Sequence, residues 1–159
     1  MLCLVLSLSA CGGQGSFQLH WTLGCATVGD TTPACQITNA LDCSRVGLDA
    51  LEVLVRRAPT DTPTRTQLAC YAPGEGPLGR GPGLDAGKVS LEVYGITPGG
   101  QRLVGPIFAD ATIPDAGFVA VEINLPIPPA CGDGVDNDGD GLVDLHDPSC
   151  KDAAGTSEE

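Results

Sequence analysis

The stretch SFQLHWTL, residues 16–23, decides the fold, because apolar and polar side chains alternate along it with a period of two. That period is typical of a β-strand with one buried face, whereas a helix repeats its apolar face every three to four residues. We expect His20 on the solvent face, and Trp21 in the core rather than stacked on a sugar. The side chains expected to point inward are Phe17, Leu19, Trp21 and Leu23.

Five further segments repeat this alternation, and glycine- and proline-rich turns separate them. The stretch APGEGPLGRGPGLDAG, residues 72–87, predicts a loop without regular structure, and residues 24–44 predict a long loop tied by disulfides. No stretch has a convincing amphipathic helical pattern. The chain is therefore predicted to be all-β, an antiparallel β-sandwich of about seven strands. The five segments are residues 48–57, 66–71, 88–97, 101–108 and 118–125.

The chain has 159 residues, which suits one domain with short appendages. Its formal net charge is −12, and the part from residue 131 onward holds nine acidic residues and one lysine, a net charge of −8. Phosphate backbones are repelled by such a surface, and no stripe of lysine and arginine is present to release counterions. The composition therefore argues against nucleic acid as a partner.

The first residues, MLCLVLSLSACGG, form an apolar run that ends in small residues, which is typical of an export signal. The run is too short for a membrane-spanning helix, which needs about 20 residues. Within it, Leu8-Ser9-Ala10-Cys11 resembles a bacterial lipobox. That resemblance implies that residues 1–10 are removed and that Cys11 carries a lipid. We accordingly expect a protein of the bacterial cell envelope, an outer-membrane lipoprotein facing the periplasm or the cell surface.

Cysteine usage agrees with export. With Cys3 removed and Cys11 lipidated, six cysteines remain in an oxidising compartment, where three disulfides are the natural interpretation. No C-x-x-C spacing supports a zinc site. Cys131 and Cys150 flank one acidic loop and are expected to pair. Positions before and within strands favour Cys43 with Cys70, which leaves Cys25 with Cys35, although six cysteines allow 15 connectivities.

The acidic loop between the last two cysteines reads CGDGVDNDGDGLVDLHDPSC, residues 131–150. Counted from Asp136 as position 1, carboxylates and a glycine follow the spacing of a twelve-residue calcium loop. Gly141, at position 6, permits a sharp bend, and Leu142, at position 7, offers its backbone carbonyl. Mg²⁺ fits such a loop less well because it demands strict octahedral geometry. The predicted Ca²⁺ ligands are Asp136, Asp138, Asp140, Leu142, Asp144 and Asp147.

The pattern D-x-D-x-D-G-x-x-D-x-x-D, residues 136–147, resembles a thrombospondin type 3 repeat and the first half of a dockerin repeat. The proline-rich flank before it is not helical, which distinguishes the loop from an EF-hand. The order of strands and hairpins over residues 16–127 resembles the immunoglobulin-like or transthyretin-like modules of bacterial surface proteins. Together these resemblances imply a surface lipoprotein whose sandwich carries a calcium loop at its C-terminal side.

The expected organisation is a signal peptide at 1–10, a tether at 11–15, the sandwich at 16–127, the calcium loop at 128–150 and a disordered tail at 151–159. The sequence predicts a noncatalytic envelope protein with a structural or adhesive role, because no catalytic constellation can be assembled. The alternative is a calcium-dependent ligand-binding module, lectin-like or protein-docking. Its loops 24–44 and 72–87 would then hold a glycan or an envelope protein. A second alternative for the acidic loop is a solvated segment without metal, in which His146 simply faces water.

Overall fold

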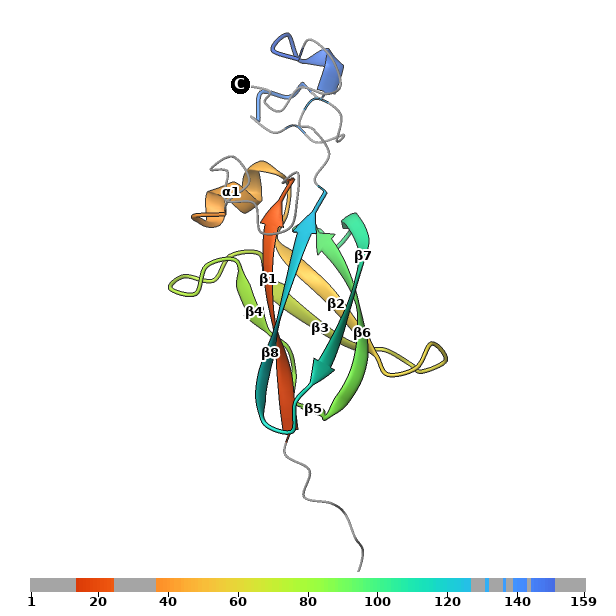
Figure 1. Ribbon diagram of the computed structural model, residues 1–159. Coiled ribbons are helices and arrows are strands. Elements are labelled where there is room, and N and C mark those ends of the chain that lie inside the picture. The colour runs from red at the N-terminus through yellow and green to blue at the C-terminus, as the bar shows by residue number, and fades with distance from the viewer. Residues whose placement is uncertain are drawn as a thin grey trace, which may run out of the picture.

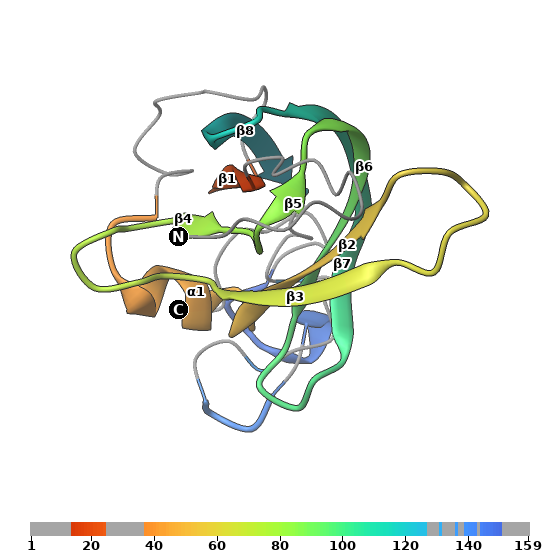
Figure 2. The same cartoon turned by 90° about the horizontal axis from the view of Figure 1, so that it is seen from below.

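The computed structural model describes residues 14–24, 37–126, 131, 136, 139–142 and 144–150, without the side chains of Arg45 and Asp144. Its strands form two four-stranded sheets that face each other (Figure 1). Figure 2, seen from below, separates the layers: β8, β1, β4 and β5 form one, and β3, β2, β6 and β7 form the other. The β-sandwich predicted from alternation is therefore present.

The first sheet, here called sheet A, is built around β1 (Gln14–Leu23). Along one edge β1 pairs in parallel with β8 (Gly117–Leu125), from Gly15 opposite Gly117 to Leu23 opposite Leu125. The other edge pairs antiparallel with two short strands, β4 (Leu78–Arg80) and β5 (Leu84–Asp85). Because β1 and β8 run in the same direction, the chain enters sheet A at one end and leaves it at the other.

The second sheet, sheet B, has the order β3-β2-β6-β7 and is antiparallel throughout. Its strands are β2 (Ala50–Arg56), β3 (Thr64–Ala69), β6 (Gly87–Ile96) and β7 (Arg102–Ile113). A turn at Pro98-Gly99-Gly100 joins β6 to β7 as a hairpin, and β7 continues five residues beyond the end of the predicted segment 101–108. Sheet B thus supplies an extended outer face as well as half of the core.

The core lies between the two sheets and is made of the alternating apolar residues. Phe17, Leu19 and Trp21 of β1 have no exposed surface, and neither do Leu51 of β2 and Leu91 of β6. The prediction that Trp21 packs in the core is confirmed. Its indole Nε1 donates a hydrogen bond of 3.0 Å to the carbonyl oxygen of Cys70, which satisfies the polar atom that burial would otherwise leave unpaired.

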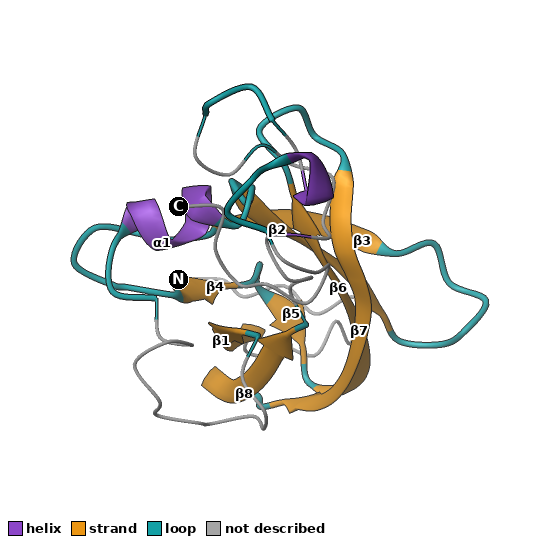
Figure 3. Ribbon diagram, turned by 90° about the horizontal axis from the view of Figure 1, so that it is seen from above, coloured by secondary structure: helices purple, strands orange, loops and turns teal. Residues whose placement is uncertain are grey.

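The prediction of a loop over residues 24–44 is wrong at its C-terminal end. Residues Ala40–Arg45 form a short helix, α1, which Figure 3 shows beside the sheets. Asn39 caps its first turn by accepting from the Leu41 N–H at 2.8 Å, and the carboxylate of Asp42 accepts from the Asn39 N–H at 3.1 Å. This reciprocal capping box fixes a turn that no apolar periodicity announces.

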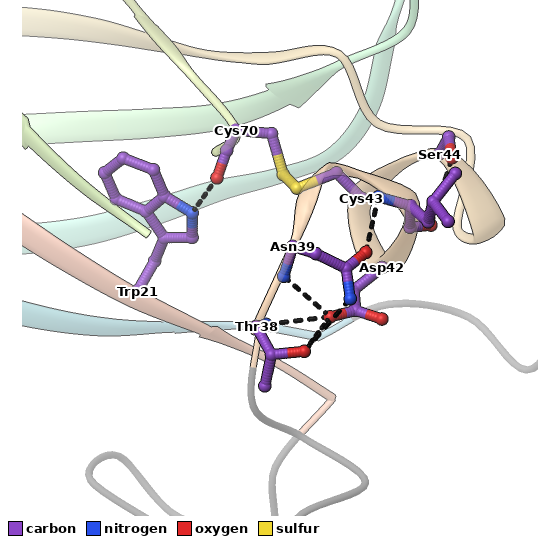
Figure 4. Close-up of a disulfide and its surroundings, with 8 residues drawn as sticks. Trp21, Thr38, Asn39, Asp42, Cys43, Ser44 and Cys70 are labelled. Carbon is purple, nitrogen blue, oxygen red and sulfur yellow. Dashed lines mark hydrogen bonds between the residues drawn. A yellow bond between two sulfur atoms is a disulfide. The ribbon is translucent and has the colours of Figure 1, made fainter. Parts of the chain in front are cut away.

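A disulfide between Cys43 of α1 and Cys70, just after β3, fastens the helix to sheet B (Figure 4). The two Cα atoms lie 6.1 Å apart. This is the pairing that the sequence favoured. The Cys70 carbonyl that accepts from Trp21 belongs to the same residue, so the disulfide, the indole and the end of β3 form one buried unit.

The prediction that residues 72–87 lack regular structure is also wrong, because β4 and β5 lie within them. Gly81 shows how this glycine-rich stretch can lie close against β1, because a Cβ atom at position 81 would be 2.2 Å from the Phe17 ring. The Gly81 N–H donates to the Phe17 carbonyl at 2.9 Å. The glycines of this stretch thus permit close approach to β1 rather than preventing pairing. The parallel pairing of β1 with β8 likewise departs from the fully antiparallel expectation.

Candidate metal site in the acidic loop

The acidic loop is closed by a disulfide between Cys131 and Cys150, the pairing expected from their flanking positions. Their Cα atoms are 5.5 Å apart and Cys131 is fully buried. The Cys150 N–H donates to the Asp147 carbonyl at 3.1 Å, so the turn that carries Asp147 is attached directly to the disulfide. Between Cys131 and Cys150 in the sequence lies a short 3₁₀ helix, η3 (Asp144–His146).

Asp136, at the first position of the predicted calcium loop, organises the bend that follows it. Its Oδ1 accepts from the Gly139 N–H at 2.7 Å, and its Oδ2 accepts from the Gly141 N–H at 2.9 Å. Gly141 has a φ of +92°, a backbone conformation that glycine adopts without strain. The sharp bend predicted at position 6 is therefore present. Asp140 adds a further turn, because its Oδ1 accepts from the Leu142 N–H at 2.7 Å.

Asp147, at the last position of the predicted loop, is the unusual residue of the segment. Only 4% of its surface is exposed. Its Oδ1 accepts from both the N–H and the hydroxyl of Ser149, at 2.6 and 2.7 Å. Its Oδ2 is buried and has no hydrogen-bond partner among the residues that the structure describes. The loop spacing predicts Asp147 as a ligand, but residue order alone indicates neither its burial nor the supporting role of Ser149.

An unpartnered carboxylate oxygen in a buried position is unfavourable, because a group that loses its water must gain a compensating interaction. A bound cation supplies such an interaction for Oδ2. Each carboxylate oxygen carries two lone pairs, so the hydrogen bonds at Asp136 leave acceptor capacity on both of its oxygens. Hard oxygen donors of this kind match Ca²⁺ rather than a soft metal. By donor chemistry alone, the carboxylates of Asp136 and Asp147 would suit Ca²⁺ better than a soft metal.

Two of the predicted ligand side chains, those of Asp138 and Asp144, lie outside the described residues. Across the described ranges, no three histidine, cysteine, aspartate or glutamate side chains are grouped so that they could hold a metal ion. The structure therefore describes the Asp136 and Asp147 ends of the loop without bringing the whole predicted ligand set together. Cys25, Cys35 and Cys11 also lie outside the described residues.

A second charged cluster lies on the outer face of sheet B. Glu52 of β2 is 2% exposed, and both Arg65 and Arg102 pair with it. The hydrogen bond that Arg102 donates to Glu52 raises the pKa of Arg102, whose guanidinium also lies 3.5 Å from the centre of the Tyr94 ring. Alternation along residues 48–57 puts Glu52 on the face of β2 opposite to Leu51 and Val53. The arginine and tyrosine side chains of the other strands of sheet B cover it, so the burial of Glu52 depends on how the strands are arranged.

Tyr94 connects this cluster to Glu92, its neighbour on the outer face of β6. The hydroxyl of Tyr94 donates to Glu92, and Arg56 of β2 forms an ion pair with the same carboxylate. The hydrogen bond from Tyr94, followed by that from Arg56, lowers the pKa of Glu92 below its ordinary value of 4.5. The same contact raises the pKa of Tyr94. Because these charges satisfy one another, the cluster stabilises the sheet and leaves little capacity for a ligand.

The two histidines are exposed, as expected: His20 on the outer side of β1 and His146 in η3. Within the part of the chain that the structure covers, no helix combines the length and the apolar character needed to cross a membrane. Comparisons with protein-family models, with curated proteins and with solved structures found no match.

Proposed function

We propose that residues 136–147 bind one Ca²⁺ ion and that this ion orders the acidic loop. The observation that carries the proposal is the buried Asp147 Oδ2, which has no hydrogen-bond partner within the described ranges and belongs to the ligand position that closes a calcium loop. The bend at Asp136 and Gly141 supports it, because it curves the backbone of a segment whose aspartates repel each other unless a cation lies among them. In this proposal the Asp138 and Asp144 side chains complete the set of ligands.

We further propose that the protein is a noncatalytic component of the bacterial envelope, anchored by a lipid on Cys11, with the calcium-ordered loop as a structural or adhesive element. Parallel pairing of β1 and β8 supports this arrangement. The strand that follows the anchor starts at one end of sheet A, and the strand that precedes the acidic loop finishes at the other (Figure 1). Nine paired residues at about 3.3 Å each separate the two ends by roughly 30 Å, which would display the loop away from the membrane.

Intact-mass measurement of the mature protein tests the anchor. The proposal predicts a chain that begins at Cys11, carries added acyl mass and contains no free thiol. A mature chain that begins elsewhere, or an unmodified Cys11, contradicts it.

Limited proteolysis tests the role of the loop. Removal of calcium with EGTA should speed cleavage between residues 131 and 150 by tenfold or more and leave the sandwich intact. Asp147→Asn should be cut quickly even with calcium present, because it removes the carboxylate charge from the buried position. Asp115→Asn, an exposed site between β7 and β8, removes the same charge and serves as the control. Equal cleavage with calcium and with EGTA would contradict the proposal.

A further inference from the structure

A cavity of about 300 Å³ opens on the outer face of sheet B, where β2 ends and β6 begins. The volume lies at the lower end of the range of small-ligand sites. Its polar lining comes from two strands, β6 and β7, and from the residue after β2, and none of it belongs to the acidic loop. The polar residues that line it are Arg57, Lys88, Ser90, Asp110 and Thr112.

The distribution of positive charge makes this cavity distinctive in a chain of net charge −12. Among the cationic side chains that the structure describes, those of residues 56, 65 and 102 are in ion pairs, and Arg80 lies over the Phe118 ring. The two that remain, Arg57 and Lys88, line the same cavity. Opposite charge there comes from Asp110, which accepts a hydrogen bond of 2.9 Å from the Ser90 hydroxyl.

Arg57 is held in place by backbone carbonyls. Its guanidinium donates to the carbonyl oxygens of Asp85 and Ala86. A guanidinium has five N–H donors, so further donors remain for an anion. Lys88 lies two residues after Ala86 and contributes a second cation with three donors. The hydroxyls of Ser90 and Thr112 add neutral donors beside the two charges.

The cavity lies at the end of the sandwich where the chain enters. Asp85, whose carbonyl accepts from Arg57, is paired with Gln14, the first residue of β1. Cys11 precedes Gln14 by three residues, a span of about 10 Å at full extension. A lipid on Cys11 would therefore hold this end of sheet A against the membrane surface, with the cations of the cavity close to the lipid headgroups.

We propose that Arg57 and Lys88 form a binding site for the phosphate group of an anionic phospholipid headgroup, an inference that rests on the proposed lipidation of Cys11. The guanidinium and the ammonium bind the phosphate oxygens. Ser90 and Thr112 donate to the same anion, and Asp110 accepts from a hydroxyl of the headgroup. The site fixes the orientation of a protein that would otherwise be repelled by an anionic membrane, and keeps the acidic loop pointed away from it.

The test uses the chain from Cys11 onward, coupled through the Cys11 thiol to a maleimide lipid in nanodiscs. Chemical coupling supplies the anchor, so the result does not depend on whether cells lipidate the protein. Amide chemical shifts of residues 88, 90 and 112 are compared in discs of phosphatidylcholine with and without phosphatidylglycerol. Inorganic phosphate is titrated separately into the uncoupled chain.

The proposal predicts shifts at these amides only in the discs that contain phosphatidylglycerol. Lys88→Gln should lower the ratio of docked to undocked protein about fivefold, the effect of one basic side chain at an anionic surface. Arg45→Gln, in α1 at the other end of the sandwich, removes the same charge and should change the ratio less than twofold.

Three results would overturn the assignment. The first is the same set of amide shifts in both kinds of disc. The second is an equal loss of docking in the Lys88→Gln and Arg45→Gln variants, which would show that only net charge matters. The third is a response of the cavity to inorganic phosphate without a response to phosphatidylglycerol, which would assign the site to a soluble phosphate. Failure of the mass measurement on Cys11 would instead contradict the proposed anchor.

Discussion

Removal of the disulfide that closes the acidic loop should weaken calcium binding by a large factor. Cys131 and Cys150 are 19 residues apart in sequence. Closing a loop of that length lowers the conformational entropy of the open state by an amount equivalent to about 3 kcal/mol at 25 °C. If calcium must order the loop against repulsion among its aspartates, the free energy of calcium binding has to supply this ordering cost once the disulfide is absent. The upper limit of the effect is roughly a 200-fold rise in Kd.

Some order remains in an open loop, because Asp136 and Asp147 make their hydrogen bonds with residues close in sequence. We therefore expect the double variant Cys131→Ala/Cys150→Ala to raise the calcium Kd by between about tenfold and 200-fold. Equilibrium dialysis with radioactive calcium measures the change directly. The near-ultraviolet circular dichroism of Trp21, the single tryptophan of the chain, should stay the same, because that residue reports on the sandwich.

A Kd within threefold of the native value, with the Trp21 signal intact, would refute this reasoning. It would mean that the loop is already ordered without the cross-link, or that calcium binds without ordering it. Loss of the Trp21 signal would show instead that the loop and the sandwich fold as one unit, which the proposed organisation does not allow.

Three further predictions concern the sandwich. Glu52→Gln should lower the free energy of unfolding in urea by about 2 kcal/mol, because the ion pairs with Arg65 and Arg102 lose their anion. A loss below about 0.5 kcal/mol would contradict the importance of the buried carboxylate. Because the pKa of Glu92 is lowered on folding, its contribution to stability is complete above the ordinary value of 4.5 and is lost as the pH falls through the folded pKa. Native protein should therefore lose more stability than Glu92→Gln as the pH drops below 4.5, and parallel pH profiles would count against this. Gly81→Ala should destabilise the fold by about 1–3 kcal/mol, because the new methyl group would contact the buried Phe17 ring on β1. A Cβ atom at Gly99 would lie 3.7 Å from its nearest neighbour, so Gly99→Ala should change the free energy of unfolding by less than about 0.5 kcal/mol. Similar values for the two variants would contradict the packing argument.

Alternation was sufficient to predict the strands that form the core, because a residue such as Leu91 is buried by the same period that places Glu92 outside. It could not predict which strands pair. The parallel contact of β1 with β8 joins the first and last strands of the sandwich, and no local pattern encodes a partner a hundred residues away. Helix α1 was missed because its six residues depend on the capping box at Asn39 rather than on an apolar face.

The acidic loop was the part of the candidate site that sequence could predict, since ligand spacing follows directly from residue order. The bend at Gly141 is present for that reason. The buried Oδ2 of Asp147 was beyond prediction because burial depends on how the loop folds around it. The cavity at Arg57 and Lys88 was missed for a related reason: these residues are 31 positions apart and meet only through the pairing of β2 with β6.

Isothermal titration of Ca²⁺ into the oxidised protein tests the central claim most directly. The proposal predicts one site with a Kd of about 10⁻⁴–10⁻³ M, the range of extracellular calcium modules. It also predicts no measurable binding to Asp147→Asn and unchanged binding to the charge-matched variant Asp115→Asn. Absence of any heat of binding at millimolar calcium, or equal binding by Asp147→Asn and native protein, would contradict a calcium site at residues 136–147.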